Sequence, residues 1–508
     1  MSLFKRKKIV TASETPLGTD INIKCLKKVD KGEILSETKL KWKYEDKGVE
    51  YPSSYVVKTN DGFSYQIDEP YLDEKKKAKL ENKMKMLYYV IKPSEEDQLI
   101  AQILQAIDYD KTMGYYVIRD ILRYNVLTPL FDDMEIEDIS YAGAGVDKAR
   151  GDVVWVFHRG FGTWLPTNIH LTPSDADYLV QRIALKAGKS VTLAKPIVDA
   201  ISPEGYRLAL TYGREVSLPG SSISIRKPLE DVWTLSYMIY SKRIMSDWMA
   251  SAIWYVLENR GVVLVVGRSG TGKTTLINGM LTILPPTWKI VTVEEIPELK
   301  VIHPNWVRLI SRKSTTFMEY AEAVDIPLDK LIAHTLRIRP DLVSVGEVRT
   351  KEELNEFIHS VASGHGGVTS IHAEDFPSLK ARFNYSGIDD SFFSIISLVV
   401  FIDSFPVNVN GNTFLRRRVQ EMGEINLIQG QAVYNRLAVY NPVTDMWDDS
   451  DLIKSKRLSL LAYKKGKTEE GLKLELEERN EFFKLTAKST ITEFKSGLQK
   501  FYERRGVM

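Results

Sequence analysis

Apolar residues recur with the period of a helix in some stretches of this chain and fill whole short runs in others. Helical spacing from Leu99 to Ile107 and from Met249 to Leu257 predicts amphipathic helices. Alternating or wholly apolar runs predict strands, at 153–157, 221–225, 262–266, 289–293, 306–311, 342–345 and 368–372. Helical patterns near 273–284, 318–336 and 351–363 alternate with the later strands. This alternation predicts an α/β region with a mostly parallel sheet covered by helices.

The pattern also divides the chain. Residues 1–95 are polar and Lys-rich, and we interpret the basic run within them, Lys75–Lys85, as a solvated helix face. Residues 96–230 combine helices and strands as in a smaller α+β domain, and 226–235 mix charge with proline like a linker. Residues 231–508 contain the alternating elements and end in amphipathic helices. We predict a variable N-terminal region, an α+β N-terminal domain and a larger α/β domain.

Composition is that of an ordinary folded protein. The chain has 508 residues, which is enough for two or three domains, and a formal charge of +2, without the basic excess of a dedicated nucleic-acid binder. Its one cysteine, Cys25, excludes an intrachain disulfide and favours a reducing compartment. The most apolar uncharged run, 392–402, is about half of the roughly 20 residues that a spanning helix needs. The start of the chain, MSLFKRKKIV, lacks the apolar region of a secretory signal, so we expect a cytoplasmic protein.

A glycine-rich loop carries the strongest chemical signal. Residues 267–274 (GRSGTGKT) fit G-x-x-x-x-G-K-S/T and lie between an apolar strand and a helix, which is the context that this motif requires. Backbone N–H groups of such a loop surround phosphates, the lysine reaches the β- and γ-oxygens, and the hydroxyl residue ligates Mg²⁺. We predict that ATP is bound by Gly267, Ser269, Gly270, Thr271, Gly272, Lys273, Thr274 and Thr275.

Acidic residues at strand ends are the candidates for hydrolysis. Glu347 follows the apolar strand 342–345, where it can hold a water of the metal or polarise the attacking water. Glu294 and Glu295 end another strand, and either one could activate water. A surface pair before Pro297 would have the same pattern, so the residues alone leave both interpretations open.

Two histidines, His365 and His372, frame the segment GHGGVTSIH, which we interpret as a loop entering a strand. His365 follows a glycine and could sense the γ-phosphate. A structural role is equally compatible with the pattern.

Taken together, GRSGTGKTT, VEEIPEL, RIRPDLVSVGEVR and GHGGVTSIHA resemble the type II/IV secretion system ATPase superfamily, over about residues 96–445. The resemblance implies a RecA-like ATPase domain joined by a linker to the N-terminal domain. It also implies a Walker A motif at 267–274, catalytic Glu294 and Glu295, and a Walker B Glu347 that shares the metal with Thr274. His365 and His372 become a histidine box.

The resemblance extends to the N-terminal domain and to partners. Arg207 and Arg226 look like the family's phosphate-contacting arginines, although a strand-face arginine paired with Glu204 or Glu230 is the alternative. Bacterial pilus and type II members usually carry a paired CxxC element; its absence, and the C-terminal segment LAYKKGKTEEGLKLELEERNEFFKLTAKS, point to the archaeal pilus and archaellum branch. The resulting expectation is a homo-hexamer that is peripheral to the inner face of the membrane and works on a polytopic platform protein. No nucleic-acid partner is expected. A DNA-translocating motor and a low-turnover ATP switch are the alternatives.

Overall fold

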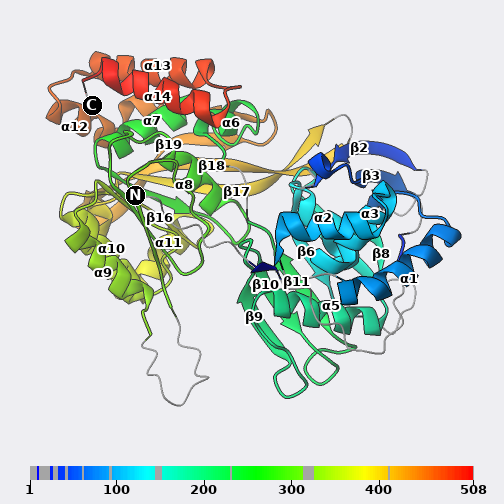
Figure 1. Cartoon of the computed structure of the whole chain (residues 1–508). Coiled ribbons are helices and arrows are strands. Elements are labelled where there is room, and N and C mark those ends of the chain that lie inside the picture. The colour runs from blue at the N-terminus through cyan, green and yellow to red at the C-terminus, as the bar shows by residue number, and fades with distance from the viewer. Residues whose placement is uncertain are drawn as a thin grey trace, which may run out of the picture. The chain divides into compact units, whose positions relative to one another are not determined.

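The computed structural model describes the chain in two compact units, residues 1–228 and 229–508 (Figure 1). Within them the described residues are 9–10, 23–26, 32–40, 44–59, 62–90, 94–143, 152–228, 232–312, 325–409 and 412–506. The boundary between the units lies inside the predicted linker. The finer, three-part division of the chain stays a prediction.

The N-terminal unit is built on a nine-stranded sheet of order β2-β3-β4-β8-β7-β6-β11-β10-β9. Its neighbours are antiparallel except β4 and β8, which pair in parallel at Tyr65 and Thr167. The strands are β2 (Glu33–Lys39), β3 (Ser53–Thr59), β4 (Gly62–Asp68), β6 (Ile136–Tyr141), β7 (Val153–His158), β8 (Thr163–His170), β9 (Ile197–Ile201), β10 (Arg207–Thr211) and β11 (Ser222–Arg226). A separate pair joins β1 (Ile9–Val10) to β5 (Ser94–Glu95). Segments from the first 95 residues therefore extend the same sheet as the later strands.

Helices cover this sheet and close two apolar cores, one of which lies largely between the helices. The helices are α1 (Glu74–Val90), α2 (Glu96–Ala106), α3 (Lys111–Val117), α4 (Thr128–Asp132) and α5 (Pro173–Lys186). A capping box at the start of α5, in which Thr172 and Asp175 exchange hydrogen bonds with each other's backbone N–H, shows how local sequence sets a helix end.

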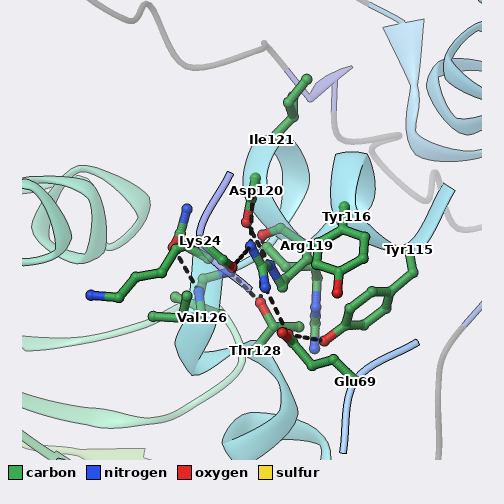
Figure 2. Close-up of polar contacts among 12 residues, drawn as sticks. Lys24, Glu69, Tyr115, Tyr116, Arg119, Asp120, Ile121, Val126 and Thr128 are labelled. Carbon is green, nitrogen blue, oxygen red and sulfur yellow. Dashed lines mark hydrogen bonds and ion pairs between the residues drawn. The ribbon is translucent and has the colours of Figure 1, made fainter. Parts of the chain in front are cut away.

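A buried ion cluster holds the helices to the segment 23–26. Arg119 is wholly buried and lies in the π-helical turn Ile118–Leu122 that continues α3. Its guanidinium contacts Glu69 at 2.7 Å and Asp120 at 2.6 Å, and it donates to the Lys24 carbonyl at 2.8 Å (Figure 2). Glu69 also accepts from the Tyr115 hydroxyl at 2.7 Å. We call Lys24, Glu69, Tyr115, Arg119 and Asp120 the Arg119 cluster.

The second unit has a mixed nine-stranded sheet of order β14-β13-β15-β16-β12-β17-β18-β19-β20. The first six strands in this order are parallel and the last three add antiparallel hairpins. The strands are β12 (Val262–Val266), β13 (Ile290–Glu294), β14 (Trp306–Ile310), β15 (Leu342–Val345), β16 (Gly366–Ile371), β17 (Leu398–Val409), β18 (Asn412–Ile428), β19 (Gln431–Asn441) and β20 (Met446–Asp448). One strand, β16, separates β12 from β15.

Helices cover both faces of this sheet. One apolar core joins α6 (Leu235–Tyr240), α7 (Asp247–Glu258) and α8 (Lys273–Leu281) to the C-terminal helices α12 (Lys456–Lys464), α13 (Glu469–Leu485) and α14 (Ile491–Arg504). The other core contains side chains of α9 (Leu328–Ile338), α10 (Lys351–Ala362) and α11 (Phe376–Tyr385). Figure 1 shows α9 and α10 on the side of this unit away from α13 and α14. The predicted α/β class, with a RecA-like parallel sheet after a smaller α+β domain, is confirmed.

Element boundaries differ from the sequence-based expectation in one informative place. The helix expected near 318–336 begins at Leu328 in α9 and runs to Ile338, and the part of the prediction at 318–324 lies outside the described residues. Pro327 occupies the residue before α9, where proline suits a helix start. In the described ranges, no helix is both long and apolar enough to span a bilayer.

Candidate nucleotide-binding site

The glycine-rich loop lies at the carboxyl end of β12, a strand in which all five side chains are buried. Glycine is needed in this loop for two different reasons, close approach of another backbone and positive φ angles. A Cβ at Gly267 would lie 2.4 Å from the Ile402 carbonyl oxygen, whereas Gly270 and Gly272 have φ angles of +77° and +98°. The loop then enters α8 at Lys273, so backbone N–H groups gather at a helix N-terminus. Such a terminus attracts anions.

Lys273 has the environment of a phosphate ligand. Its side chain is 7% exposed, and its ammonium donates to the Arg268 carbonyl at 2.9 Å and to His372 Nδ1 at 3.2 Å. Burial lowers the pKa of Lys273. Within the described ranges this ammonium forms no ion pair, so a buried positive charge remains for an anion to neutralise.

His372 connects the loop to Glu347. It follows β16, and its Nε2 contacts a carboxylate oxygen of Glu347. Burial and the neighbouring Lys273 lower the pKa of His372. Nδ1 accepts from the Lys273 ammonium, which requires that this nitrogen carry no proton. These two contacts of the ring make a continuous path from the loop to the end of β15.

Arg349 joins the two acidic segments. Its guanidinium contacts Glu347 at 2.9 Å and Glu295 at 2.6 Å. Burial opposes its charge, yet these carboxylates raise the pKa of Arg349. Arg349 belongs to the motif RIRPDLVSVGEVR, but no role was predicted for it from the sequence. Its position two residues after Glu347, just past the end of β15, could have indicated that it lies near the site.

Glu294 and Glu295 have different surroundings although they are adjacent. Glu294 is 2% exposed and accepts from the backbone N–H groups of Glu298 at 2.7 Å and Leu299 at 2.5 Å. Its other oxygen accepts from Arg308 at 3.2 Å. Burial raises the pKa of Glu294, and these donors oppose the rise. Glu294 therefore closes the turn after β13, whereas the half-exposed Glu295 faces Arg349.

His365 lies at the opposite end of β16 from His372. It precedes the strand and its Nδ1 lies 2.9 Å from the Ser363 hydroxyl and 3.1 Å from the Ser360 carbonyl, at the end of α10. Six residues of strand separate the two histidines by about 20 Å. Because β12 and β16 are parallel, His365 lies at the amino ends of these strands, and the loop of the same chain lies at their carboxyl ends. Gly366 and Gly367 belong to this strand and not to a loop, so His365 lies outside the contacts that join Lys273 to Glu347. Its contact with a nucleotide stays a prediction.

The remaining loop residues surround the helix start. Thr271 donates to the Arg268 carbonyl at 2.9 Å, Ser269 is exposed, and Thr274 and Thr275 are partly exposed in the first turn of α8. The described residues contain no group of three or more side chains suited to holding a metal. Mg²⁺ typically takes one or two protein ligands and completes its shell with phosphate oxygens and water, so a hydroxyl and a carboxylate fit it chemically.

Arg207 and Arg226 lie directly opposite each other on β10 and β11 of the N-terminal unit. Arg226 pairs with Asp138 of β6, at 2.7 Å and 3.3 Å. The alternative partner Glu230 lies outside the described residues. Like charges placed opposite on neighbouring strands repel, so acidic or anionic partners stabilise this arrangement.

Fold and site together define a P-loop nucleotide-binding domain, in which one strand separates the loop strand β12 from the acidic strand β15. Residues 175–403 match the sequence profile of the family described as "Type II/IV secretion system protein". This match supports the predicted superfamily.

Individual relatives agree. An uncharacterised protein of Methanocaldococcus jannaschii is 31% identical over 315 residues, which cover 61% of this chain and 54% of that protein. The chain thus spans about half of that relative's length. The type IV secretion system protein VirB11 of Brucella suis is 28% identical over 271 residues, covering 49% of this chain and 72% of VirB11.

Similar chains are also found among solved structures, including the following two. The ATPase DotB of Yersinia pseudotuberculosis is 17% identical, with 74% of this chain and 92% of DotB covered and a TM-score of 0.40. The pilus retraction motor PilT, solved with bound ADP, is 17% identical, with coverages of 56% and 79% and a TM-score of 0.38.

Proposed function

We propose that this chain is an ATP-hydrolysing motor subunit that powers assembly of a type IV pilus-like filament, a pilus or an archaellum. The contact path from Lys273 through His372, Glu347 and Arg349 to Glu295 carries the proposal. It brings a phosphate-binding lysine and two carboxylates from three strand ends into one site. The family match supports a secretion-type ATPase, and the archaeal relative supports the archaeal branch.

The residues divide the work in the following way. Backbone N–H groups of 267–274 and the Lys273 ammonium bind the phosphates, and Arg349 orients Glu295 and Glu347. The Thr274 hydroxyl and Glu347, directly or through water, would hold Mg²⁺, which would supply charge stabilisation at the phosphates. His372, in its neutral form, keeps the Glu347 carboxylate beside the lysine.

Of the two adjacent glutamates, Glu295 is the proposed general base. Glu294 has both oxygens occupied by donors, so it acts by positioning the turn that carries Glu295. Glu295→Gln should keep ATP binding and lower turnover by about 10²–10⁴-fold, the usual contribution of a general base. Glu294→Gln is the matched comparison and should lower thermal stability as well as turnover. Turnover of Glu295→Gln at the wild-type rate, measured by phosphate release, would overturn the assignment.

The wider proposal has a homo-hexamer at the inner face of the cell membrane that passes its motion to a polytopic platform protein. Phosphate release should increase with vesicles containing anionic lipid and stay unchanged with single- or double-stranded DNA. Stimulation by DNA alone, with a steep loss on adding salt, would instead favour the DNA-translocating alternative. Failure of all additions to raise a negligible basal rate would favour an ATP-binding switch.

Arg207 and Arg226 remain proposed phosphate-contacting residues, because their guanidinium groups concentrate positive charge on one sheet face. Arg207→Ala and Arg226→Ala should each lower turnover and abolish the change in radius of gyration that a non-hydrolysable ATP analogue induces in solution scattering. Normal turnover and compaction in both variants would contradict the proposal.

A further inference from the structure

The P-loop has a second flank, formed by β17 and β18. The loop strand β12 pairs in parallel with β17, for example Val266 with Phe401. Strand β17 continues beyond the end of β12 and turns into β18, which places Ser404 opposite Arg417. A hairpin therefore rises beside the glycine-rich loop, on the side away from β16.

The Arg417 side chain covers the last glycine of the loop. A Cβ built on Gly272 would lie 3.2 Å from Arg417 Cδ and 3.8 Å from its Nε. Gly272 is the residue before Lys273 and forms the N-cap of α8. A guanidinium thus lies beside the backbone N–H groups that, in a loop of this kind, surround the α- and β-phosphates.

This flank is opposite the residues proposed to act on the γ-phosphate. Strand order places β16 and β15, with His372, Glu347 and Arg349, on one side of β12 and places β17 and β18 on the other. Charges on the β18 side therefore lie across the loop from the residues proposed to act on the γ-phosphate.

We propose that Arg417 is a nucleotide-contacting residue whose guanidinium binds the α- and β-phosphates that ATP and ADP share. The inference rests on the proposed nucleotide binding at this loop. A guanidinium presents several N–H donors in a planar fork that matches phosphate oxygens, and the N-terminus of α8 attracts the same anion. Arg417 then contributes to affinity for both nucleotides equally and leaves the hydrolytic step unchanged, because its contact exists before and after the reaction.

The experiment compares equilibrium binding of ADP and of a non-hydrolysable ATP analogue, and separately kcat and KM for ATP, in the full chain. Arg417→Ala should raise both dissociation constants about tenfold, as expected for loss of a hydrogen bond to a charged group, with kcat within about twofold of wild type. Arg416→Ala is the matched control: the neighbouring arginine lies over the Phe414 ring at 5.4 Å, and successive side chains of a strand point to opposite faces. This variant should bind both nucleotides normally.

Arg417→Met separates charge from packing, because methionine keeps an apolar chain over Gly272 and removes the guanidinium. Affinity as low as that of Arg417→Ala supports the proposal, whereas wild-type affinity would overturn it and leave Arg417 as packing only. Loss for ATP alone, or a fall in kcat with unchanged affinity, would also overturn it. If wild-type protein binds neither nucleotide, and Lys273→Ala makes no difference, the proposed function itself fails; binding that depends on Lys273 but not on Arg417 refutes this inference alone.

Discussion

Two clusters of charge, one in each unit, are built from similar residues and differ in what surrounds them. In the Arg119 cluster, the guanidinium has no exposed surface and Glu69 and Asp120 are 3% and 8% exposed (Figure 2). At the nucleotide site, the Arg349 side chain is 53% exposed and Glu347 is 21% exposed. Both clusters place one arginine between two carboxylates.

The difference separates a structural role from a chemical one. The Arg119 donors end on the neighbouring Asp120 and on Glu69 and the Lys24 carbonyl from two distant segments, which leaves little room for a ligand. At the site, Lys273 forms no ion pair with any residue that the structure describes, and Arg349 and Glu347 stay open to solvent. In the closed cluster each charge therefore depends on its partners, whereas the open charge beside the glycine-rich loop is proposed to bind a ligand.

The largest effect is expected in the closed cluster. Arg119→Met should lower the free energy of unfolding by about 3–5 kcal/mol, because Glu69 and Asp120 would stay buried without their partner. Chemical denaturation of the full chain, followed by fluorescence, measures it. Arg349→Met is the matched control and should cost at most about 1 kcal/mol, since exposed ion pairs contribute little. Equal destabilisation by both variants would remove the distinction between the clusters.

Next in size is the loss of chemistry at the open site. Lys273→Ala should lower turnover at least about a thousandfold, which corresponds to about 4 kcal/mol, because the lysine charge reaches the phosphates. Circular dichroism should remain that of the wild type. ATP hydrolysis within a few-fold of wild type would show that the loop is not the nucleotide site.

Glu347→Gln should separate binding from turnover. The amide keeps the shape of the carboxylate but weakens the metal and water contacts, so turnover should fall about a hundredfold, or about 2.7 kcal/mol, with nucleotide affinity preserved. Calorimetric titration and phosphate release measure the two quantities. Equal losses in both would assign Glu347 a structural role like that of Glu69.

The smallest effect concerns pH. Since burial and Lys273 lower the pKa of His372, the folded chain binds fewer protons there than the unfolded chain near pH 6.5. The stabilising contribution is present above pH 6.5 and is lost as the pH falls towards the lowered value. Melting temperature should therefore decline slightly more on acidification in wild type than in His372→Gln. An equal decline of the melting temperature in both proteins on acidification would mean that His372 does not couple the loop to Glu347.

Several features of the site could be predicted from local sequence. The run Val262–Val266 and the following glycines gave strand, loop and helix in the right order, because apolar runs and glycine conformations act over a few residues. Fold class followed from the alternation of elements. The roles of the site residues remain proposals.

Positions that depend on the sheet could not be read in this way. His365 and His372 are seven positions apart in one motif, but the length of β16 places them at opposite ends of this strand. Glu294 and Glu295 are neighbours in sequence, yet β13 ends between them, so one closes the turn after the strand and the other faces Arg349.

The amino-acid sequence by itself determined that a phosphate-binding loop follows a buried strand, since the residues that build the loop are consecutive. Tertiary structure alone decided which charges meet: β18 lies beside the loop and brings Arg417 to Gly272, although 145 positions separate them in the sequence. It also buried Arg119, which no local pattern distinguishes from a surface arginine. The physical reason is that burial and pairing depend on which strands and helices become neighbours, and those contacts join residues far apart in the chain.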